Sequence, residues 1–209
     1  LRTDDGNIWL SMFCGGVFKV ENLDTDFRTD ALENIRKSLR TNSVRSIFPM
    51  PDGRLWLGII GFGMVLYDPF DGSFLSYEKY PAFRDFPYTS SVDVISRRRS
   101  TSEICFGTYS QGLWLLDPSS RSGARRVISE EYPDFSHLGV TAIAEDNASN
   151  LWIGTRKGVF VMTPGNKVFS IADYLPDIRG RIHEKTGNIV RLSKGPSDQT
   201  AVGREKTIH

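Results

Sequence analysis

The sequence predicts an all-β fold, a β-propeller segment whose repeats are blades of four short antiparallel strands. The main observation is a motif that recurs at Trp9, Trp56, Cys105 and Trp152, positions that lie 47, 49 and 47 residues apart. A period of about 40 to 50 residues is typical of propellers with one four-stranded blade per repeat. In each copy a glycine and a second apolar run follow the motif, so every unit offers at least two neighbouring strands.

The composition agrees with this fold. The 209 residues include 19 Gly, 13 Phe, 7 Tyr and 4 Trp, a mixture that suits short strands separated by tight turns. Lys and Arg number 26 against 25 Asp and Glu, which argues against a strongly basic, nucleic-acid-binding surface. No apolar run reaches the roughly 18 residues that a membrane helix needs.

Each repeat can be divided into four strands, which we letter a to d in chain order. In the second copy they are expected at 44–50, 55–60, 64–68 and 73–77, and in the fourth at 140–145, 151–155, 159–163 and 167–171. Strands a and b of the second copy are joined by Pro51-Asp52-Gly53, and strands c and d by Asp71-Gly72. Both are strong turn signals, because proline fixes φ and glycine accepts positive φ.

The repeat places four blades at about 1–42, 43–90, 91–139 and 140–172. A degenerate blade remnant and a polar tail follow at 173–209. A fifth copy could begin at Gly187-Asn188-Ile189-Val190, but Val190 lies only 38 residues after Trp152 and no Gly-Thr pair follows. We expect Gly195-Pro196 to interrupt any strand there and residues from about 193 onward to be poorly ordered. Apolar spacing also predicts helical structure within 30–39.

The phrase Val-x-x-Ile-x-x-x-x-x-Gly-x-Leu-Trp-x-Gly, which runs from Val44 to Gly58, resembles the two-component regulator propeller repeat. The copy that begins at Val140 carries Asn150 in place of the glycine, and the third copy departs at Cys105. The resemblance covers residues 1 to about 172. It implies a periplasmic sensor region of a hybrid two-component histidine kinase, best known in gut Bacteroidetes, that binds oligosaccharides. It also implies a piece of a larger protein, with the other blades of the parent chain as partners.

Propeller geometry indicates where a ligand would bind. Loops d–a and b–c open on one face, and here the long insertions are all d–a loops, at 22–42, 79–90 and 130–139. Long loops on a rigid scaffold are where binding residues concentrate. Cationic and aromatic side chains of these loops are therefore the candidate ligand-binding residues: Phe62, Tyr109, Gln111, Arg156 and Lys157 in b–c loops, and Arg84, Phe86 and Tyr88 in a d–a loop. The aromatic residues of the d–a loop could instead pin that loop to the blade rim.

Other candidate sites favour structural interpretations. The tryptophans of strand b are expected to pack between blades, Cys105 to be a buried apolar residue, and His137 to be a solvated loop residue. The arginine runs 97–99 and 125–126 are expected at a solvated edge. No cluster predicts a metal site, and no cofactor is expected.

Two functional alternatives stay open beside a ligand sensor. One is a protein–protein interaction scaffold that uses the same loop face. The other is an enzyme related to the streptogramin lyases, which are propellers with a similar repeat, although no histidine here falls on the inner strand of a complete blade. An open arc of four blades, marginally stable and able to form a homodimer through its terminal blades, is also expected.

Overall fold

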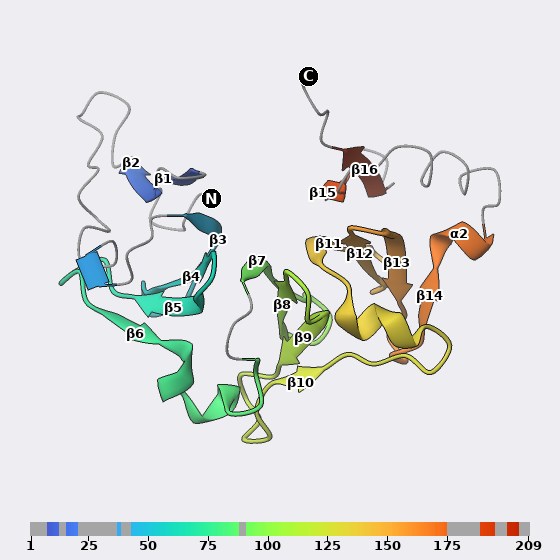
Figure 1. The fold of residues 1–209 in the computed structure, drawn as a ribbon, viewed down its shortest axis with the longest axis horizontal. Coiled ribbons are helices and arrows are strands. Elements are labelled where there is room, and N and C mark those ends of the chain that lie inside the picture. Colours follow the sequence, from blue (N-terminus) through green and yellow to red (C-terminus); the bar gives the residue numbers. More distant parts are fainter. Residues whose placement is uncertain are drawn as a thin grey trace. The chain divides into compact units, whose positions relative to one another are not determined.

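The computed structural model describes residues 8–12, 16–20, 37–38, 43–87, 91–174, 189–194 and 200–204. Within these residues the fold is all-β apart from short helical turns, with three four-stranded antiparallel sheets and two two-stranded sheets (Figure 1). The chain divides into two compact units, Leu1–Ile95 and Ser96–His209. The propeller-like repetition of four-stranded antiparallel sheets confirms the all-β part of the prediction, with three such sheets in the described residues instead of four.

The first unit contains one complete sheet and one strand pair. β1 (Ile8–Met12) pairs with β2 (Gly16–Val20). The complete sheet follows the chain order β3 (Val44–Pro49), β4 (Leu55–Ile59), β5 (Gly63–Tyr67) and β6 (Phe74–Ser76). The predicted turns are confirmed, because Gly53 and Gly72 have φ of 87° and 71°. The chain then continues through two 3-10 turns, η2 (Tyr77–Lys79) and η3 (Pro81–Phe83).

Strands β4 and β5 are buried along their whole length and form the core of this blade. Leu57, Ile59 and Val65 are fully buried in one apolar cluster. Gly58 marks where the next strand of the unit approaches, since a Cβ built there would lie 2.1 Å from the carbonyl oxygen of Val92. The glycine of the Trp-x-Gly motif is therefore required by close packing between successive repeats.

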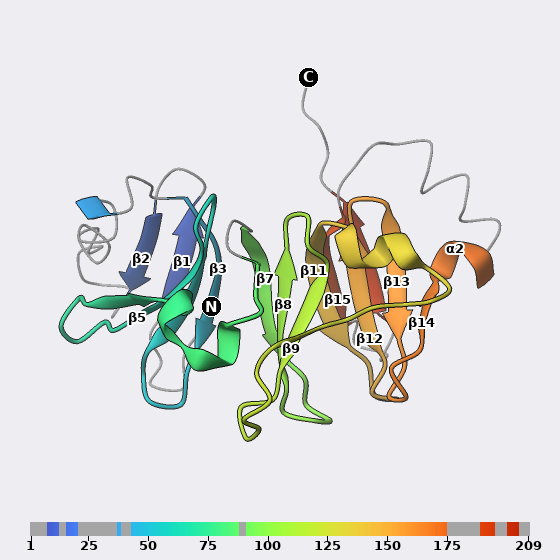
Figure 2. The ribbon, with the colours of Figure 1, turned by 60° about the horizontal axis from the view of Figure 1, so that its bottom comes forward.

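The third sheet has the order β7 (Val92–Arg97), β8 (Ile104–Thr108), β9 (Leu113–Leu116) and β10 (Arg125–Arg126), and the boundary between the two units falls within β7. The 3-10 turn η4 (Pro133–His137) leads to the next blade. That blade contains β11 (Val140–Glu145), β12 (Leu151–Thr155), β13 (Gly158–Met162) and β14 (Val168–Ser170), followed by the single helical turn α2 (Ile171–Tyr174) (Figure 2). The predicted strand limits of this repeat are confirmed to within one residue.

A further strand pair, which the sequence did not predict, lies in the C-terminal segment. β15 (Ile189–Lys194) pairs with β16 (Thr200–Arg204), so strands are present on both sides of Gly195-Pro196. Residues 193–194 and 200–204 are thus in strands, within the segment for which the sequence predicted poor order. In the same unit, β15 lies beside β11 and β12.

The register of this pair repeats that of strands a and b in the blades. In all three strand pairs the register shifts by one residue after the first pair of facing residues, and five residues connect the two strands. In each, a glycine of strand b also faces the third residue of strand a. The glycine pairs are Gly58 with Ser46, Gly154 with Ala142 and Gly203 with Arg191. Ala201 then occupies the Trp position, 49 residues after Trp152. The remnant is thus the a–b pair of a fifth repeat, in which alanine replaces the marker tryptophan.

Two other expectations are only partly covered. The predicted first blade is represented by the β1–β2 pair, so four four-stranded blades are not seen in the described part of the chain. Of the helical segment predicted at 30–39, the structure describes Lys37 and Ser38, and both are helical. The tryptophans were expected to be packing residues, and Trp56 and Trp114 are indeed buried, while Trp152 is half-buried.

Candidate functional site

The b–c loops of the second unit are shaped by a buried threonine at the end of strand b. The hydroxyl of Thr108 donates to the carbonyl oxygen of Gly112 at 2.8 Å, and it accepts the backbone N–H of Gln111. Thr155 makes the equivalent bond to the carbonyl oxygen of Gly158, also at 2.8 Å. A hydroxyl that closes the loop from inside fixes the residues between it and strand c. The Gly-Thr ending of the repeat therefore positions the loop side chains.

The 130–139 loop, which is the d–a loop between the third and fourth blades, meets both b–c loops. The N–H of Gly112 donates to the carbonyl oxygen of Leu138 at 3.1 Å, and the N–H of Arg156 donates to that of Gly139 at 3.0 Å. A Cβ built on Gly139 would lie 2.4 Å from the carbonyl oxygen of Tyr109 and 2.6 Å from Nε of Arg156. Predicted residues from two successive repeats therefore come together around a glycine.

Tyr109 and Arg156 form a cation–π pair at this junction. The guanidinium carbon of Arg156 lies 4.0 Å from the centre of the Tyr109 ring. Half of the Tyr109 surface is still exposed, at 50%, and Lys157 is exposed beside Arg156 in the chain. Such a pair contributes about 0.5–1 kcal/mol at an exposed position and holds both side chains in place. It leaves an ordered aromatic and cationic surface at the ends of strands β8 and β12.

Gln111 takes part in a second arrangement, which we call the Arg126 cluster and which consists of Gln111, Arg126, Ser136 and His137. Nε of Arg126 donates to the carbonyl oxygens of Gln111 and Ser136, at 3.2 and 3.1 Å. Its Nη2 donates to Oε1 of Gln111 at 3.1 Å and lies 3.2 Å from Nδ1 of His137. The expectation that Arg126 lies at a solvated edge is wrong, because its side chain is half-buried and bonded to the b–c loop and to the 130–139 loop.

The remaining predicted residues lie in the first unit. Phe62 is partly exposed, at 38%, in the turn between β4 and β5, and Arg84 is exposed in the d–a loop. Phe86 is buried and makes edge contacts with Tyr77 and Phe83, at centroid distances of 5.4 and 5.7 Å. Its assignment to the binding surface is therefore corrected, because the ring pins the loop to the blade. Tyr88 lies outside the described residues.

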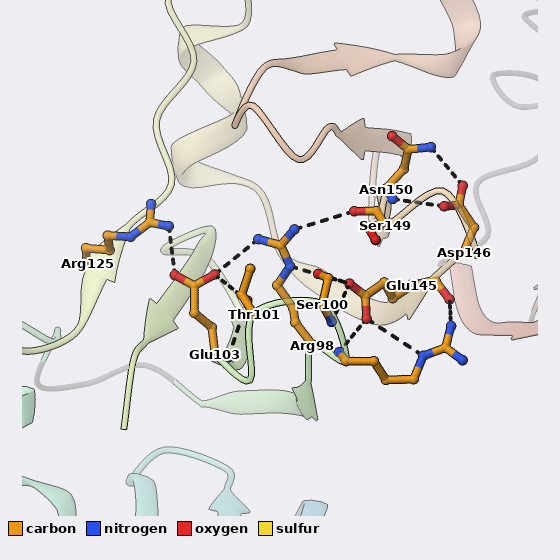
Figure 3. A network of polar contacts seen from close by, with 10 residues as sticks. Arg98, Ser100, Thr101, Glu103, Arg125, Glu145, Asp146, Ser149 and Asn150 are labelled. Carbon is orange, nitrogen blue, oxygen red and sulfur yellow. Dashed lines mark hydrogen bonds and ion pairs between the residues drawn. The ribbon is translucent and has the colours of Figure 1, made fainter. Parts of the chain in front are cut away.

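A polar network between the third and fourth repeats, which the sequence analysis missed, occupies the a–b turns (Figure 3). Arg98, expected to be solvated, is only 2% exposed, and its Nη1 donates to Glu103 at 3.1 Å. Its Nε lies 3.8 Å from Glu145, whose side chain is 5% exposed. Glu145 also accepts hydrogen bonds from the backbone N–H of Arg99 and from the hydroxyl of Ser100.

Hydrogen bonding decides the ionisation of Glu145. Burial alone is the largest single influence and would raise its pKa, but the bonds from Ser100 and Arg99 and the charge of Arg98 outweigh it, so the pKa lies below its usual value. Asp146 follows the same rule, since burial is outweighed by hydrogen bonds from Trp152 and Asn150 that lower its pKa. Glu145 and Asp146 are therefore ionised at neutral pH, and the contacts of Glu145 with Arg98, Arg99 and Ser100 join two successive repeats.

The other candidate chemistry is structural. Cys105 is a free, fully buried thiol, and burial raises its pKa to about 12, so it is not a nucleophile. Over the described ranges, no group of three or more His, Cys, Asp or Glu side chains is arranged to hold a metal ion. None of the helices in this part of the chain is long and apolar enough to cross a membrane.

Comparison with known proteins confirms the resemblance to the repeat family. Residues 134–157 match the model of the family described as "Two component regulator propeller". This match begins in the 130–139 loop and ends in the b–c loop that carries Arg156. A comparison with curated proteins gives no match.

Solved structures with a similar fold include extracellular domains from B. thetaiotaomicron. One is BT4673, described as a hybrid two component system, with a TM-score of 0.68 and 18% identity over 98% of this chain and 25% of that one. Another is BT3049, described in the same way, with a TM-score of 0.66 and 18% identity over 95% of this chain and 24% of that one. The chain thus spans about a quarter of the length of these two.

A virginiamycin B lyase from Staphylococcus aureus has a TM-score of 0.55 and 13% identity over 81% of this chain and 53% of the lyase. At such identities these structures establish the propeller fold. The relatives from signalling systems are extracellular domains, and this chain resembles them.

Proposed function

We propose that this chain is part of the periplasmic, ligand-sensing region of a two-component histidine kinase and that its ligand is an oligosaccharide. The observation that carries the proposal is the convergence of the 130–139 loop with two b–c loops, which assembles Tyr109, Gln111, Arg156 and Lys157 in the second unit. An ordered aromatic ring beside hydrogen-bond donors is the combination that sugar rings need, an apolar face and hydroxyl partners. In the first unit, Phe62 and Arg84 offer the same two chemistries.

The resemblance to extracellular domains of signalling systems supports a sensor over an enzyme. The enzyme alternative would need a general base on an inner strand, and His137, the single histidine among the described residues, lies in η4 between strands. The likeness to a lyase concerns the fold alone. A scaffold that binds another protein through the same face is the alternative that the experiment must separate from a sensor.

The test is a thermal-shift and calorimetric panel of the 209-residue chain against oligosaccharides. We expect at least one to raise the melting temperature and Tyr109→Ala to weaken its binding about tenfold or more, since stacking and the Arg156 pair are lost together. Phe70→Ala is the matched control, because Phe70 is an exposed aromatic of a c–d turn, at 87%. If no sugar binds and a protein partner is captured through Tyr109, the chain is a scaffold.

A further inference from the structure

We propose that the site in the second unit recognises an oxyanion, a carboxylate or sulfate group, so that the sensed oligosaccharide is acidic. This inference rests on the proposed function and adds the chemical class of the ligand. It starts from Arg126, which is half-buried and whose hydrogen-bond partners are backbone oxygens, an amide oxygen and an imidazole nitrogen. No carboxylate of the described residues forms an ion pair with it.

Arg126 also determines what its neighbours present to a ligand. A guanidinium can only donate, so Oε1 of Gln111 must be the atom that faces it, and Nδ1 of His137 must accept. The acceptor atoms of both side chains are therefore occupied. What remains on Gln111 is the NH₂ group, and what remains on His137 is the hydrogen on Nε2.

On Arg126, Gln111 and His137, the side-chain atoms that are left for a partner from outside are thus donors, while the hydroxyl of Ser136 donates to the carbonyl oxygen of Pro133. Three nitrogen atoms form no hydrogen bond to any residue that the structure describes: Nη1 of Arg126, Nε2 of Gln111 and Nε2 of His137. All three are still accessible to a partner from outside. The exposed ammonium group of Lys157, across the 130–139 loop, is a fourth donor. A set of donors with uncompensated positive charge selects a group with acceptors only, which describes an oxyanion better than a sugar hydroxyl.

The experiment compares three oligosaccharides of equal length by calorimetry on the full chain: one of uronic acids, one sulfated and one neutral. We expect an acidic ligand to bind at least tenfold more tightly than the neutral one, and the two acidic arms distinguish carboxylate from sulfate. The decisive variant is Gln111→Glu, which keeps an oxygen for Arg126 and replaces the amide donor with negative charge. It should leave the melting temperature within about 2 °C and weaken acidic binding about tenfold to a hundredfold.

The matched control is Arg121→Gln, which removes one positive charge from an exposed loop of the same unit and should leave affinity unchanged. Arg126→Lys is a second variant, expected to lose acidic binding because an ammonium cannot hold Gln111 and His137 in the same way. Binding of the neutral ligand as tight as that of the acidic ones, with no effect of Gln111→Glu, would overturn the inference and leave the proposed function standing. Binding of none of the three would overturn both.

Discussion

At the scale of single residues, the candidate site depends on a position with no side chain. Gly139 lies where the carbonyl oxygen of Tyr109 and Nε of Arg156 approach each other, and its φ is not in the left-handed region. The requirement for glycine is therefore steric. An alanine would have to displace a backbone carbonyl on one side and the stacked guanidinium on the other, and backbone moves less readily than a side chain.

Gly139→Ala is consequently expected to lower the stability of the chain by about 1–3 kcal/mol and to weaken ligand binding several-fold through the displaced Tyr109–Arg156 pair. Chemical denaturation and calorimetry measure the two effects. Gly165→Ala is the control, since the nearest atom to a Cβ there, Oγ1 of Thr163, is 3.9 Å away. Equal melting temperatures and affinities for both variants would contradict the steric argument.

At the scale of elements, successive repeats are joined by contacts that span about one period. Ser46 donates to the carbonyl oxygen of Val92, 46 residues away, and Glu145 accepts from the N–H of Arg99, also 46 residues away. Contacts at such a distance in the sequence leave no local signal.

Strands and turns, by contrast, follow from apolar runs and from Gly, Pro and Asp signals within a few residues, so their limits could be predicted closely.

The burial of Arg98 and the partners of Arg126 could not be predicted in this way, because their acceptors belong to another repeat or another loop. An arginine run by itself is typical of a solvated edge. The β15–β16 pair was missed for a different reason: its register is that of the other a–b pairs, but Ala201 stands at the Trp position and no Gly-Thr pair follows to mark the repeat. The candidate binding loops stay a prediction, and the burial of Phe86 within one of them did not follow from the sequence.

The Glu145 network gives the link between the third and fourth repeats a defined pH dependence. Because the pKa of Glu145 is lowered in the folded chain, its contribution is fully present above the unfolded value of about 4.3 and is lost as the pH falls through the lower folded value. Glu145→Gln should cost about 1–3 kcal/mol at pH 7, and this difference should shrink as the pH falls below about 4. Urea denaturation at pH 7 and at pH 3.5 measures both, with the exposed Glu130→Gln as control. A cost of Glu145→Gln that stays constant over this range would contradict the argument.

At the scale of the whole molecule, charge is nearly balanced, with a formal net of +1 from 26 basic and 25 acidic residues. A chain with balanced charge has no strong long-range field to attract an acidic ligand, so a preference for one must come from charged groups at the site. Added salt should then weaken only the interactions of those groups with the ligand. Because Arg126 is half-buried, its interaction with a ligand is screened less than that of an exposed charge.

Raising the salt from about 0.05 M to about 0.5 M is therefore expected to weaken binding of an acidic oligosaccharide by about three- to tenfold, no more than the smallest loss expected for Gln111→Glu. Binding of a neutral oligosaccharide of the same length should stay within about twofold, and Arg121→Gln should not alter the salt dependence of either ligand. Calorimetric titrations at four salt concentrations measure these slopes. A salt dependence that is equal for the acidic and neutral ligands would place the binding energy in stacking on Tyr109 and remove the role argued for the Arg126 cluster.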